Sequence, residues 1–471
     1  MRVTTMDRYL PQPGRVVEFV PSPATLAVAD TAVASTIPPS FNQRFHLRTA
    51  DRAPGSPRHW LACAFDITGG PIDTGALRAT FEEWVRRHET LRSGFRAAPE
   101  GPPGAERFVL PAEKVELVVG DAEEYVGPKE VRGRLARRLD ETCRPLGWPT
   151  YFFSAILRPG GATVFCGFDH CNMDGYSLAI AVHEIRESYA VHAAGEIPAP
   201  DLLPETGSFV EYCAVEQERA AGPAPDRSDP VIARWGEFFA ACGGTTPSFP
   251  LDLGVPAGER APQGTDCRRL LDAEGAAEFE RRCRAAGGNV FSGALTAVGL
   301  AARRLGGGEV VRLCTPLHTR YEERWENAVG WFTTVAPLTV DIGGAAGVAE
   351  GSPRTRAAFR EALRLAERPV AQVLTALGGD VRRTRDDVFM VSYIDYRRFP
   401  GSESHLACNA HHVSSVTTAD DAQFWVSRTH EGVFLRSRHP ATPHAEQVVQ
   451  SFADTMGELL AAGAGGAPVG I

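Results

Sequence analysis

The stretch from Phe168 to Ser177 holds the residues best suited to chemistry. His170 is followed four residues later by Asp174 and then by Gly175, in the order His-x-x-x-Asp-Gly. A histidine titrates near neutral pH, so it can accept the proton of a hydroxyl or amine that attacks a carbonyl. Gly175 allows a sharp turn or a close backbone approach. From spacing alone two interpretations stay open: a catalytic base, or a structural hydrogen-bonded His–Asp pair, which is the commoner case.

This stretch lies where a strand is expected to end and a helix to begin. Residues 162–168 are apolar without alternation, which predicts a central strand covered on both faces. Residues 176–189 follow with helical spacing. Strand ends of this kind face the crevice of an α/β sheet, where ligands bind. His170 is therefore expected to be partly exposed in a crevice.

The other expected elements mix strands and helices, which predicts an α/β (α+β) fold. In the first half we expect a strand over 59–67, a helix from Asp73, a strand and turn over 107–119, a helix over 130–139 and a strand over 151–157. In the second half we expect helices over 272–286, 291–305, 353–365, 370–377 and 444–460, and strands over 310–316, 332–340, 388–394, 424–430 and 433–437.

The length of 471 residues exceeds what one hydrophobic core usually supports, which predicts two domains. Residues 193–207 and 220–232 are rich in Pro, Gly and Asp and indicate the linker between them. The expected division is an N-terminal arm over 1–38, an N-terminal lobe over 39–190, a linker over 191–232 and a C-terminal lobe over 233–471.

The composition argues against several classes of protein. The net charge of −9 and the pI near 5.9 disfavour nucleic-acid binding, because a protein that follows a phosphate backbone needs an excess of Lys and Arg. No apolar run reaches the length of a membrane span, and the first residues carry charges and prolines where a secretory signal needs an apolar core. The ten cysteines form no CxxC pair, which disfavours a metal or redox motif. A cytoplasmic protein is expected.

Three further segments surround the His-x-x-x-Asp-Gly stretch. Residues 87–95 read Arg-His-Glu-Thr-Leu-Arg-Ser-Gly-Phe, and residues 316–320 read Pro-Leu-His-Thr-Arg before Val-Gly-Trp-Phe-Thr-Thr over 329–334. Residues 389–397 read Phe-Met-Val-Ser-Tyr-Ile-Asp-Tyr-Arg. With its motifs in this order, the chain resembles the condensation-domain superfamily, whose members carry an HHxxxDG motif. Residues 389–397 resemble the polyketide-associated acyltransferase branch of that superfamily.

The resemblance implies two lobes similar to chloramphenicol acetyltransferase, set in a V with a central tunnel. It implies a thioester donor, carried on coenzyme A or on the phosphopantetheine arm of an acyl or peptidyl carrier protein, and a small-molecule acceptor. It implies no metal and no bound cofactor. It also implies a place in natural-product biosynthesis of the nonribosomal peptide or polyketide kind. The candidates for lining the tunnel are Gly330, Trp331, Thr333 and Tyr393.

The same resemblance assigns roles to the residues of the motif. His170 stands at the position of the base, and main-chain N–H groups near Gly175 are expected to bind the oxyanion. Asp174 is expected to turn away from the tunnel and to pair with Arg320, as a brace and not as a catalyst. His88 and Arg92 are interpreted as helix-end packing and salt-bridge residues.

Asp169 departs from the motif, which has two adjacent histidines. A carboxylate next to His170 would raise the pKa of the imidazole by favouring its charged form. The alternation of side chains along a strand would instead point Asp169 to the opposite face of the sheet. Both alternatives stay open from the sequence.

The expected activity is transfer of an acyl or aminoacyl group to a hydroxyl, with an ester as product. It rests on the resemblance of residues 389–397 to the ester-forming branch and on the absence of an attached adenylation or carrier module. An amide-forming peptide condensation domain is the first alternative. A non-catalytic carrier-docking module is another, although such members usually lose the histidine, and His170 is kept. No Gly-x-Ser-x-Gly elbow occurs, which argues against a hydrolase.

Overall fold

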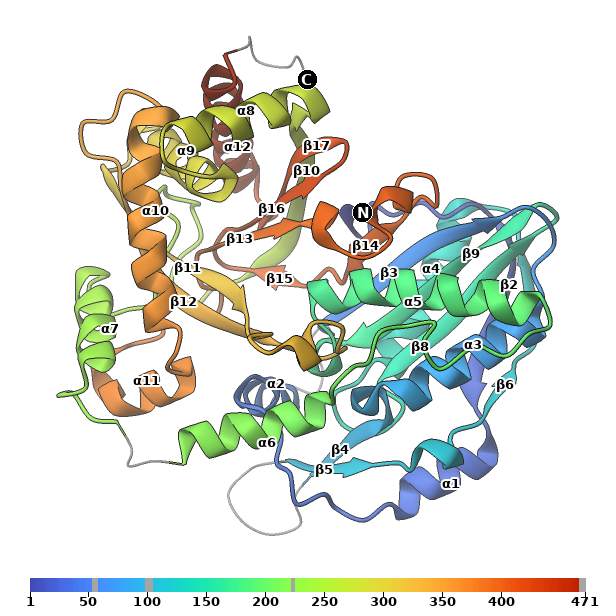
Figure 1. Ribbon diagram of the computed structural model, residues 1–471. Coiled ribbons are helices and arrows are strands. Elements are labelled where there is room, and N and C mark those ends of the chain that lie inside the picture. The colour runs from blue at the N-terminus through green and yellow to red at the C-terminus, as the bar shows by residue number, and fades with distance from the viewer. Residues whose placement is uncertain (53–57, 98–104, 222–224, 466–471) are drawn as a thin grey trace. The chain divides into compact units, whose positions relative to one another are not determined.

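The computed structural model describes residues 1–52, 58–97, 105–221 and 225–465, and the chain divides into two compact units. Unit 1 comprises Met1–Gly222, Thr319–Phe332 and Arg398–Val416, and unit 2 comprises Pro223–His318, Thr333–Arg397 and Thr417–Ile471. Each unit is built on a β-sheet with helices packed against it (Figure 1), so the predicted α/β fold is confirmed. The placement of two lobes in a V around a tunnel stays a prediction.

The described strands of the main sheet of unit 1 follow the order β1-β14-β3-β9-β8-β2-β6, with β7 beside β2. They are β1 (Arg2–Thr5), β2 (Gly14–Pro21), β3 (Trp60–Thr68), β6 (Leu117–Val119), β7 (Glu123–Tyr125), β8 (Tyr151–Arg158), β9 (Gly161–Asp169) and β14 (His411–Ser414). A separate hairpin pairs β4 (Ser93–Ala97) with β5 (Ala105–Val109). The helices of this unit are α1 (Pro23–Thr31), α2 (Phe41–Arg52), α3 (Thr74–Arg87), α4 (Pro128–Thr142), α5 (Gly175–Ala193) and α6 (Phe209–Ala220).

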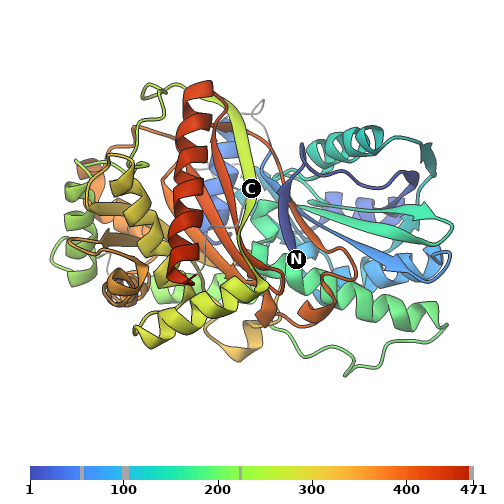
Figure 2. The same ribbon diagram turned by 90° about the horizontal axis from the view of Figure 1, so that it is seen from above.

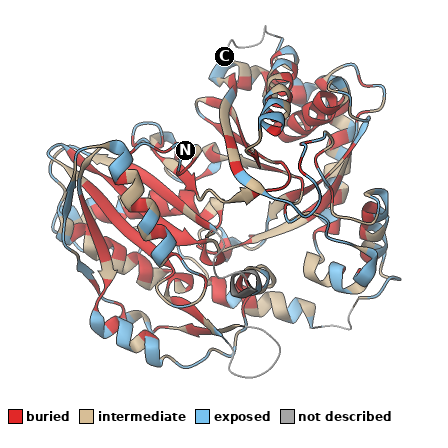
Figure 3. Cartoon of the chain, turned by 180° about the vertical axis from the view of Figure 1, so that it is seen from behind, coloured by how far each residue is buried: buried red, intermediate tan, exposed pale blue. Residues whose placement is uncertain are grey.

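β9 lies between β3 and β8, and each of its residues is buried, as its unbroken apolar run predicts (Figure 3). α4 covers one face of the sheet, where Leu139 packs with Phe165, while α3 and α5 cover the other (Figure 2). A Cβ at Gly167 would lie 2.0 Å from the Cδ2 atom of Leu139. The glycine therefore lets α4 pack closely against the last residues of β9, immediately before the His170 segment.

The segment over 1–38, expected as an N-terminal arm, instead contributes β1, β2 and α1 to unit 1. β2 lies between β8 and β6, and Val16, Val17 and Phe19 are buried there. Its main partner, β8, begins more than a hundred residues later, so no local pattern reveals the pairing. Some of the Pro and Ser residues that interrupt this segment lie at the ends of its elements: Pro21 ends β2, and Ser22 is the N-cap of α1.

The expected linker and lobe boundaries also differ from the structure. The interval over 191–232 contains α6, and two later segments, Thr319–Phe332 and Arg398–Val416, return to unit 1. In the second of these, β14 pairs with β1 and β3, so a strand from late in the sequence lies between these two strands of the main sheet. A division of the sequence into consecutive lobes misses the return of these two segments to unit 1. Each return depends on strand pairing or side-chain pairing between residues far apart in the sequence.

The sheet of unit 2 follows the order β12-β11-β13-β16-β17-β10-β15 in the described chain. Its strands are β10 (Ala261–Asp272), β11 (Val310–His318), β12 (Thr333–Asp341), β13 (Met390–Asp395), β15 (Thr418–Ala419), β16 (Gln423–Thr429) and β17 (Gly432–Pro440). Its helices are α7 (Pro230–Ala241), α8 (Ala273–Ala285), α9 (Val290–Arg304), α10 (Val348–Leu365), α11 (Val370–Leu377) and α12 (Pro443–Gly463). Apolar side chains of α8, α9, α10 and α12 form one core with this sheet.

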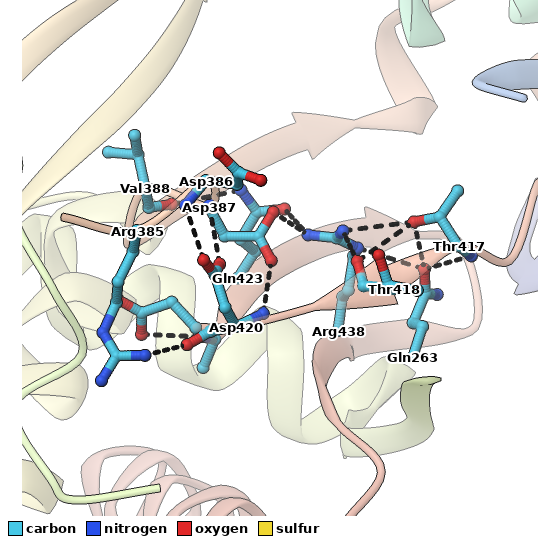
Figure 4. Close-up of polar contacts among 12 residues, drawn as sticks. Gln263, Arg385, Asp386, Asp387, Val388, Thr417, Thr418, Asp420, Gln423 and Arg438 are labelled. Atoms are coloured by element: carbon cyan, nitrogen blue, oxygen red, sulfur yellow. Dashed lines mark hydrogen bonds and ion pairs between the residues drawn. The ribbon is translucent and has the colours of Figure 1, made fainter. Parts of the chain in front are cut away.

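A buried polar network holds the point where the chain re-enters unit 2 at Thr417 (Figure 4). Gln263 accepts hydrogen bonds from Thr417 N at 3.1 Å and from Arg438 Nε at 3.1 Å. Arg438 also pairs with Asp387. The backbone N–H of Asp387 donates to Asp420 Oδ1 at 2.8 Å, and the backbone N–H of Asp420 donates to Asp387 Oδ2 at 3.0 Å. Burial alone raises the pKa of Asp387, but the Arg438 guanidinium outweighs it and holds that pKa below its ordinary value. The network fixes strands β10 and β17 to the incoming loop.

Candidate active site

The segment from Asp169 to Gly175 is a tight connection between β9 and α5. β9 ends at Asp169, a 3₁₀ turn spans His170–Asn172, and Asp174 is the N-cap of α5. The Asp174 carboxylate accepts the N–H of Ser177 at 2.8 Å, which satisfies one of the free donors of the first helical turn. The sequence prediction of a strand end followed directly by a helix is confirmed.

The turn is held from several neighbouring elements. His170 N donates to His59 O at 3.0 Å, and the fully buried Asn172 side chain donates to Thr150 Oγ1 at 2.8 Å. Gln43, on α2, donates from its Nε2 to Cys171 O at 2.8 Å. Each of these bonds comes from a different part of the chain. The backbone that carries His170 is therefore fixed before any substrate arrives.

The His170 side chain is half-buried at the end of the strand. Its Nδ1 is buried and makes no hydrogen bond to another residue of the described chain. The indole ring of Trp331 lies beside the imidazole, with ring centroids 4.3 Å apart and an interplanar angle of 36°. Nδ1 is thus enclosed, and Nε2 is the ring nitrogen left for a substrate.

Asp169 is fully buried and lies, by alternation along β9, on the face that α4 covers. Its Oδ1 accepts His46 Nε2–H at 2.9 Å and Cys171 N–H at 2.9 Å. Burial raises the pKa of Asp169, but the His46 charge and these hydrogen bonds outweigh it and lower the pKa. The carboxylate is therefore an anion that accepts two hydrogen bonds, and not a lone charge beside His170.

The pKa of His170 is lowered from its ordinary value, mainly by burial and next by the nearby charge of His46. The Asp169 and Asp174 carboxylates act in the opposite direction but do not outweigh those causes. Both sequence alternatives for Asp169 thus hold in part: it lies on the far face of the strand, and it does favour the charged imidazole. The net result is a neutral His170 at physiological pH.

Asp174 and Arg320 form the predicted pair, which is confirmed. Arg320 donates from Nη1 to Asp174 Oδ2 at 2.8 Å and from Nη2 to Asp174 Oδ1 at 3.2 Å. Ser177 Oγ lies between them, 2.7 Å from Asp174 Oδ1 and 2.8 Å from Arg320 Nη2. The guanidinium also lies over the rings of Tyr176 and Phe332, at 4.3 and 4.4 Å.

This pair is buried, with side-chain exposures of 1% for Arg320 and 7% for Asp174. Burial raises the pKa of Asp174, but the guanidinium charge and the hydrogen bonds outweigh it and hold the pKa below its ordinary value. Both carboxylate oxygens are occupied, since Oδ2 also accepts Phe332 N–H at 3.1 Å. Asp174 therefore has no oxygen left to orient His170, and it ties α5 to the segment that carries Trp331.

The four proposed tunnel residues divide between the two units. Gly330 and Trp331 belong to unit 1, and Thr333 and Tyr393 belong to unit 2. Gly330 is buried, and a Cβ there would lie 2.4 Å from the Phe209 ring, so it serves a close packing contact. The Tyr393 ring is stacked on Phe291 at 5.2 Å. Trp331 contacts the imidazole of His170.

His88 makes the expected polar contact at the end of α3, whereas Arg92 donates to a main-chain carbonyl. His88 Nε2 lies 2.6 Å from Glu184 Oε2 inside unit 1, and Arg92 donates to Leu110 O at 2.6 Å. Glu184 also accepts Trp84 Nε1–H at 2.9 Å. The two bonds to Glu184 hold the end of α3 against α5, the helix that begins at the His170 segment.

His46 and Gln43 were missed because α2 was not predicted. Its N-terminus does carry a signal: Ser40 and Gln43 form a capping box, in which Gln43 N donates to Ser40 Oγ at 3.2 Å and Ser40 N donates to Gln43 Oε1 at 3.0 Å. A search for Ser-x-x-Gln would have marked the start of this helix. Nothing local marks His46 as the partner of Asp169, because 123 residues separate them.

Within the described ranges, no group of three or more His, Cys, Asp or Glu side chains is arranged to hold a metal ion. No single helix among the described residues is long and apolar enough to cross a bilayer. The pair α8 and α9 meets that length and composition only when taken together, and it is bent by 92° between its two members.

Comparison with known proteins places these observations in context. The family model of the condensation domain matches residues 34–404. "Acyltransferase PapA3" of Mycobacterium tuberculosis is 26% identical over 97% of this chain and 95% of its own. The "2'-acyl-2-O-sulfo-trehalose (hydroxy)phthioceranyltransferase PapA1" of Mycobacterium bovis is 28% identical over 82% and 73%. The solved structure of "PapA2 acyl transferase" superposes with a TM-score of 0.86 at 24% identity, covering 99% of this chain and all of that one.

Proposed function

The chain belongs to the condensation-domain family and is an acyltransferase, and we propose that it transfers an acyl group from a thioester to a hydroxyl with His170 as general base. The observation that carries the proposal is the environment of His170. Its imidazole has a lowered pKa and an enclosed Nδ1, and it lies on a turn fixed by hydrogen bonds from several elements. Such a group is a neutral proton acceptor held in one orientation.

In the proposed reaction the acceptor hydroxyl donates its proton to His170 Nε2 as its oxygen attacks the thioester carbonyl carbon. The C–S bond then breaks, and the leaving thiolate takes the proton back from the imidazolium. The developing oxyanion needs hydrogen-bond donors, and the Gly175 N–H is one of the first-turn donors of α5 that have no intrahelical acceptor. Asp174 has a structural and not a catalytic role, because its carboxylate oxygens accept hydrogen bonds from Arg320 and from the N–H groups of Ser177 and Phe332.

The donor in this proposal is an acyl thioester of coenzyme A or of a phosphopantetheine-bearing carrier protein, and the thioester is a co-substrate. No bound cofactor or metal takes part. For the acceptor, compounds with sugar and polyol hydroxyls are the first to test, since the name of the relative PapA1 describes acyl transfer to a trehalose derivative. The screen would pair acyl thioesters of increasing chain length with such acceptors and follow the products by mass spectrometry.

The rate should depend on pH through His170. Because the base form is the active one, kcat/KM for an alcohol acceptor falls as the pH drops through the His170 pKa. Burial and His46 lower that pKa, so the acid limb is expected below the ordinary histidine value near 6.5. A pH–rate profile of kcat/KM between pH 4.5 and 9 measures the limb directly. A limb midpoint above 6.5 would contradict the assignment.

The choice between ester and amide is tested with matched acceptors. An alcohol is a weak nucleophile that needs its proton removed during attack, which suits a neutral His170, whereas an unprotonated amine needs less help. We expect an alcohol and its amine analogue, offered with the same thioester, to show transfer to the alcohol. Acylation of the amine alone at every pH would replace the proposal with a peptide-type condensation. Transfer to neither, together with tight binding of a carrier protein, would favour a docking module.

A further inference from the structure

The Asp169 carboxylate is an unusual group to bury beside a catalytic base. It is fully buried, and within the described chain its Oδ2 has no hydrogen-bond partner. A buried carboxylate is expensive to keep charged unless a cation or several donors compensate it. The two contacts on Oδ1 are the Cys171 N–H and His46, and His46 is the one that can carry a positive charge.

His46 is itself held in place by the helix that carries it. α2 is fixed to the His170 turn by the Gln43 bond to Cys171 O, and its N-terminus is held by Glu216, whose carboxylate accepts Phe41 N–H at 2.9 Å. The His46 side chain is 12% exposed and its ring lies edge-on to Trp331, with centroids 5.8 Å apart. Trp331 in turn contacts His170. One aromatic ring thus packs against both histidines.

We propose that His46 is a positioning residue for acyl transfer: by pairing with Asp169 it compensates the buried carboxylate and so keeps the catalytic imidazole of His170 in its neutral, proton-accepting form. This inference rests on the proposed role of His170 as general base. In this chain the first position of the family motif holds an acid in place of a histidine, and His46, 123 residues earlier, supplies the imidazole from another element.

The charges that surround His170 act on its imidazole with opposite signs. An uncompensated anion at Asp169 favours the imidazolium form of His170, and the charge of His46 opposes it. Asp174 also faces His170, but Arg320 neutralises that carboxylate. Loss of His46 therefore leaves one unbalanced negative charge at the site, which holds a proton on the base that must be free to accept one.

Other titratable groups lie near the His46–Asp169 pair, and the effect of each on the expected rise in the His170 pKa has to be considered. Burial raises the pKa of the Cys171 and Cys143 thiols well above the ordinary value, so both stay neutral. His59 faces His46 with ring centroids 6.3 Å apart. Burial raises the pKa of Glu216 to about 7, so this α2-capping carboxyl titrates in the same range as a histidine and needs its own control.

The test is a titration of His170 by NMR in protein labelled at histidine Cε1, with the signal assigned from the His170→Gln variant. This readout needs no substrate. In His46→Gln the amide can still donate a hydrogen bond to Asp169 but carries no charge, and we expect the His170 midpoint to rise by about one pH unit or more. In His46→Gln combined with Asp169→Asn the unbalanced charge is gone, and the midpoint is expected to return toward the wild-type value.

The acid limb of kcat/KM should follow the same order, because a rise of one unit in the His170 pKa lowers the activity of His46→Gln about fivefold at the wild-type midpoint and little at pH 9. His192→Gln is the matched control. His192 pairs with Glu83 at 2.8 Å in the same unit, but it lies near the end of α5, roughly 27 Å along the helix from Asp174. Glu216→Gln keeps the cap on α2 without its titration. Both controls are expected to leave the His170 midpoint unchanged.

An unchanged His170 midpoint in folded His46→Gln would overturn the inference, since a purely structural role alters stability and not the titration. If that variant does not fold, Asp169→Asn tests the pair from the other side: the midpoint should fall, and an unmoved midpoint contradicts the proposal. Failure of the general-base mechanism looks different. In that case His170→Ala would retain activity whatever the NMR midpoints show.

Discussion

Replacing His170 with alanine is expected to lower kcat/KM for acyl transfer by about 10²–10⁴-fold, the usual contribution of a positioned general base. The fold should be retained, because within the described chain the imidazole makes no hydrogen bond that holds another element, and its main packing contact is with Trp331. The turn itself is fixed through the backbone and through Asn172, which the substitution leaves in place. The loss should appear mainly in the chemical step.

The measurement is kcat and KM for a thioester and acceptor pair that the wild type turns over, with circular dichroism and a thermal melt on the same sample. His192→Gln is the control for a histidine removed from the same unit outside the site. Turnover near the wild-type level in His170→Ala, with a matching melting temperature, would rule out the mechanism. A large drop in melting temperature would instead assign His170 a structural role.

The Asp174–Arg320 pair is expected to give the largest effect on stability. Removing one member of a buried ion pair leaves the other charge uncompensated, which costs about 3–5 kcal/mol. Asp174→Ala and Arg320→Met should each destabilise unit 1 by this order and also abolish transfer, because the pair joins α5 to the segment that holds Trp331. The pair contributes fully at neutral pH, and its contribution is lost as the pH falls through the lowered pKa of Asp174.

A double-mutant cycle separates the pair from its surroundings. The variant that carries both substitutions buries no unpaired charge, so its loss should be smaller than the sum of the two single losses. Denaturant melts measure the free energy of unfolding of the whole protein. Hydrogen exchange of residues 170–180 measures the local stability at the start of α5. Since the chain has two units, the local measurement is the decisive one. Additive single losses, or losses below about 1 kcal/mol each, would contradict a buried, coupled pair.

Much of the fold near the site could be predicted because its signals are local. β9 is an unbroken apolar run, and such a run predicts a strand buried on both faces. α3 and α5 begin at Asp73 and Asp174, which accept N–H groups of the first turn as N-cap residues do. Strands such as β1 and β2 were missed, since their partners are β14 and β8 and a short strand gains its stability from pairing.

The sequence alone determined the strand, turn and helix that carry His170, and the family to which the motifs belong. It also pointed to Arg320 as the partner of Asp174, although only through resemblance. The tertiary structure decided what encloses the base: Trp331 over the imidazole, and His46 on the buried carboxylate of Asp169. The reason is physical. Capping and periodicity act within a few residues, whereas a contact between residues 123 or 146 positions apart depends on how the whole unit packs.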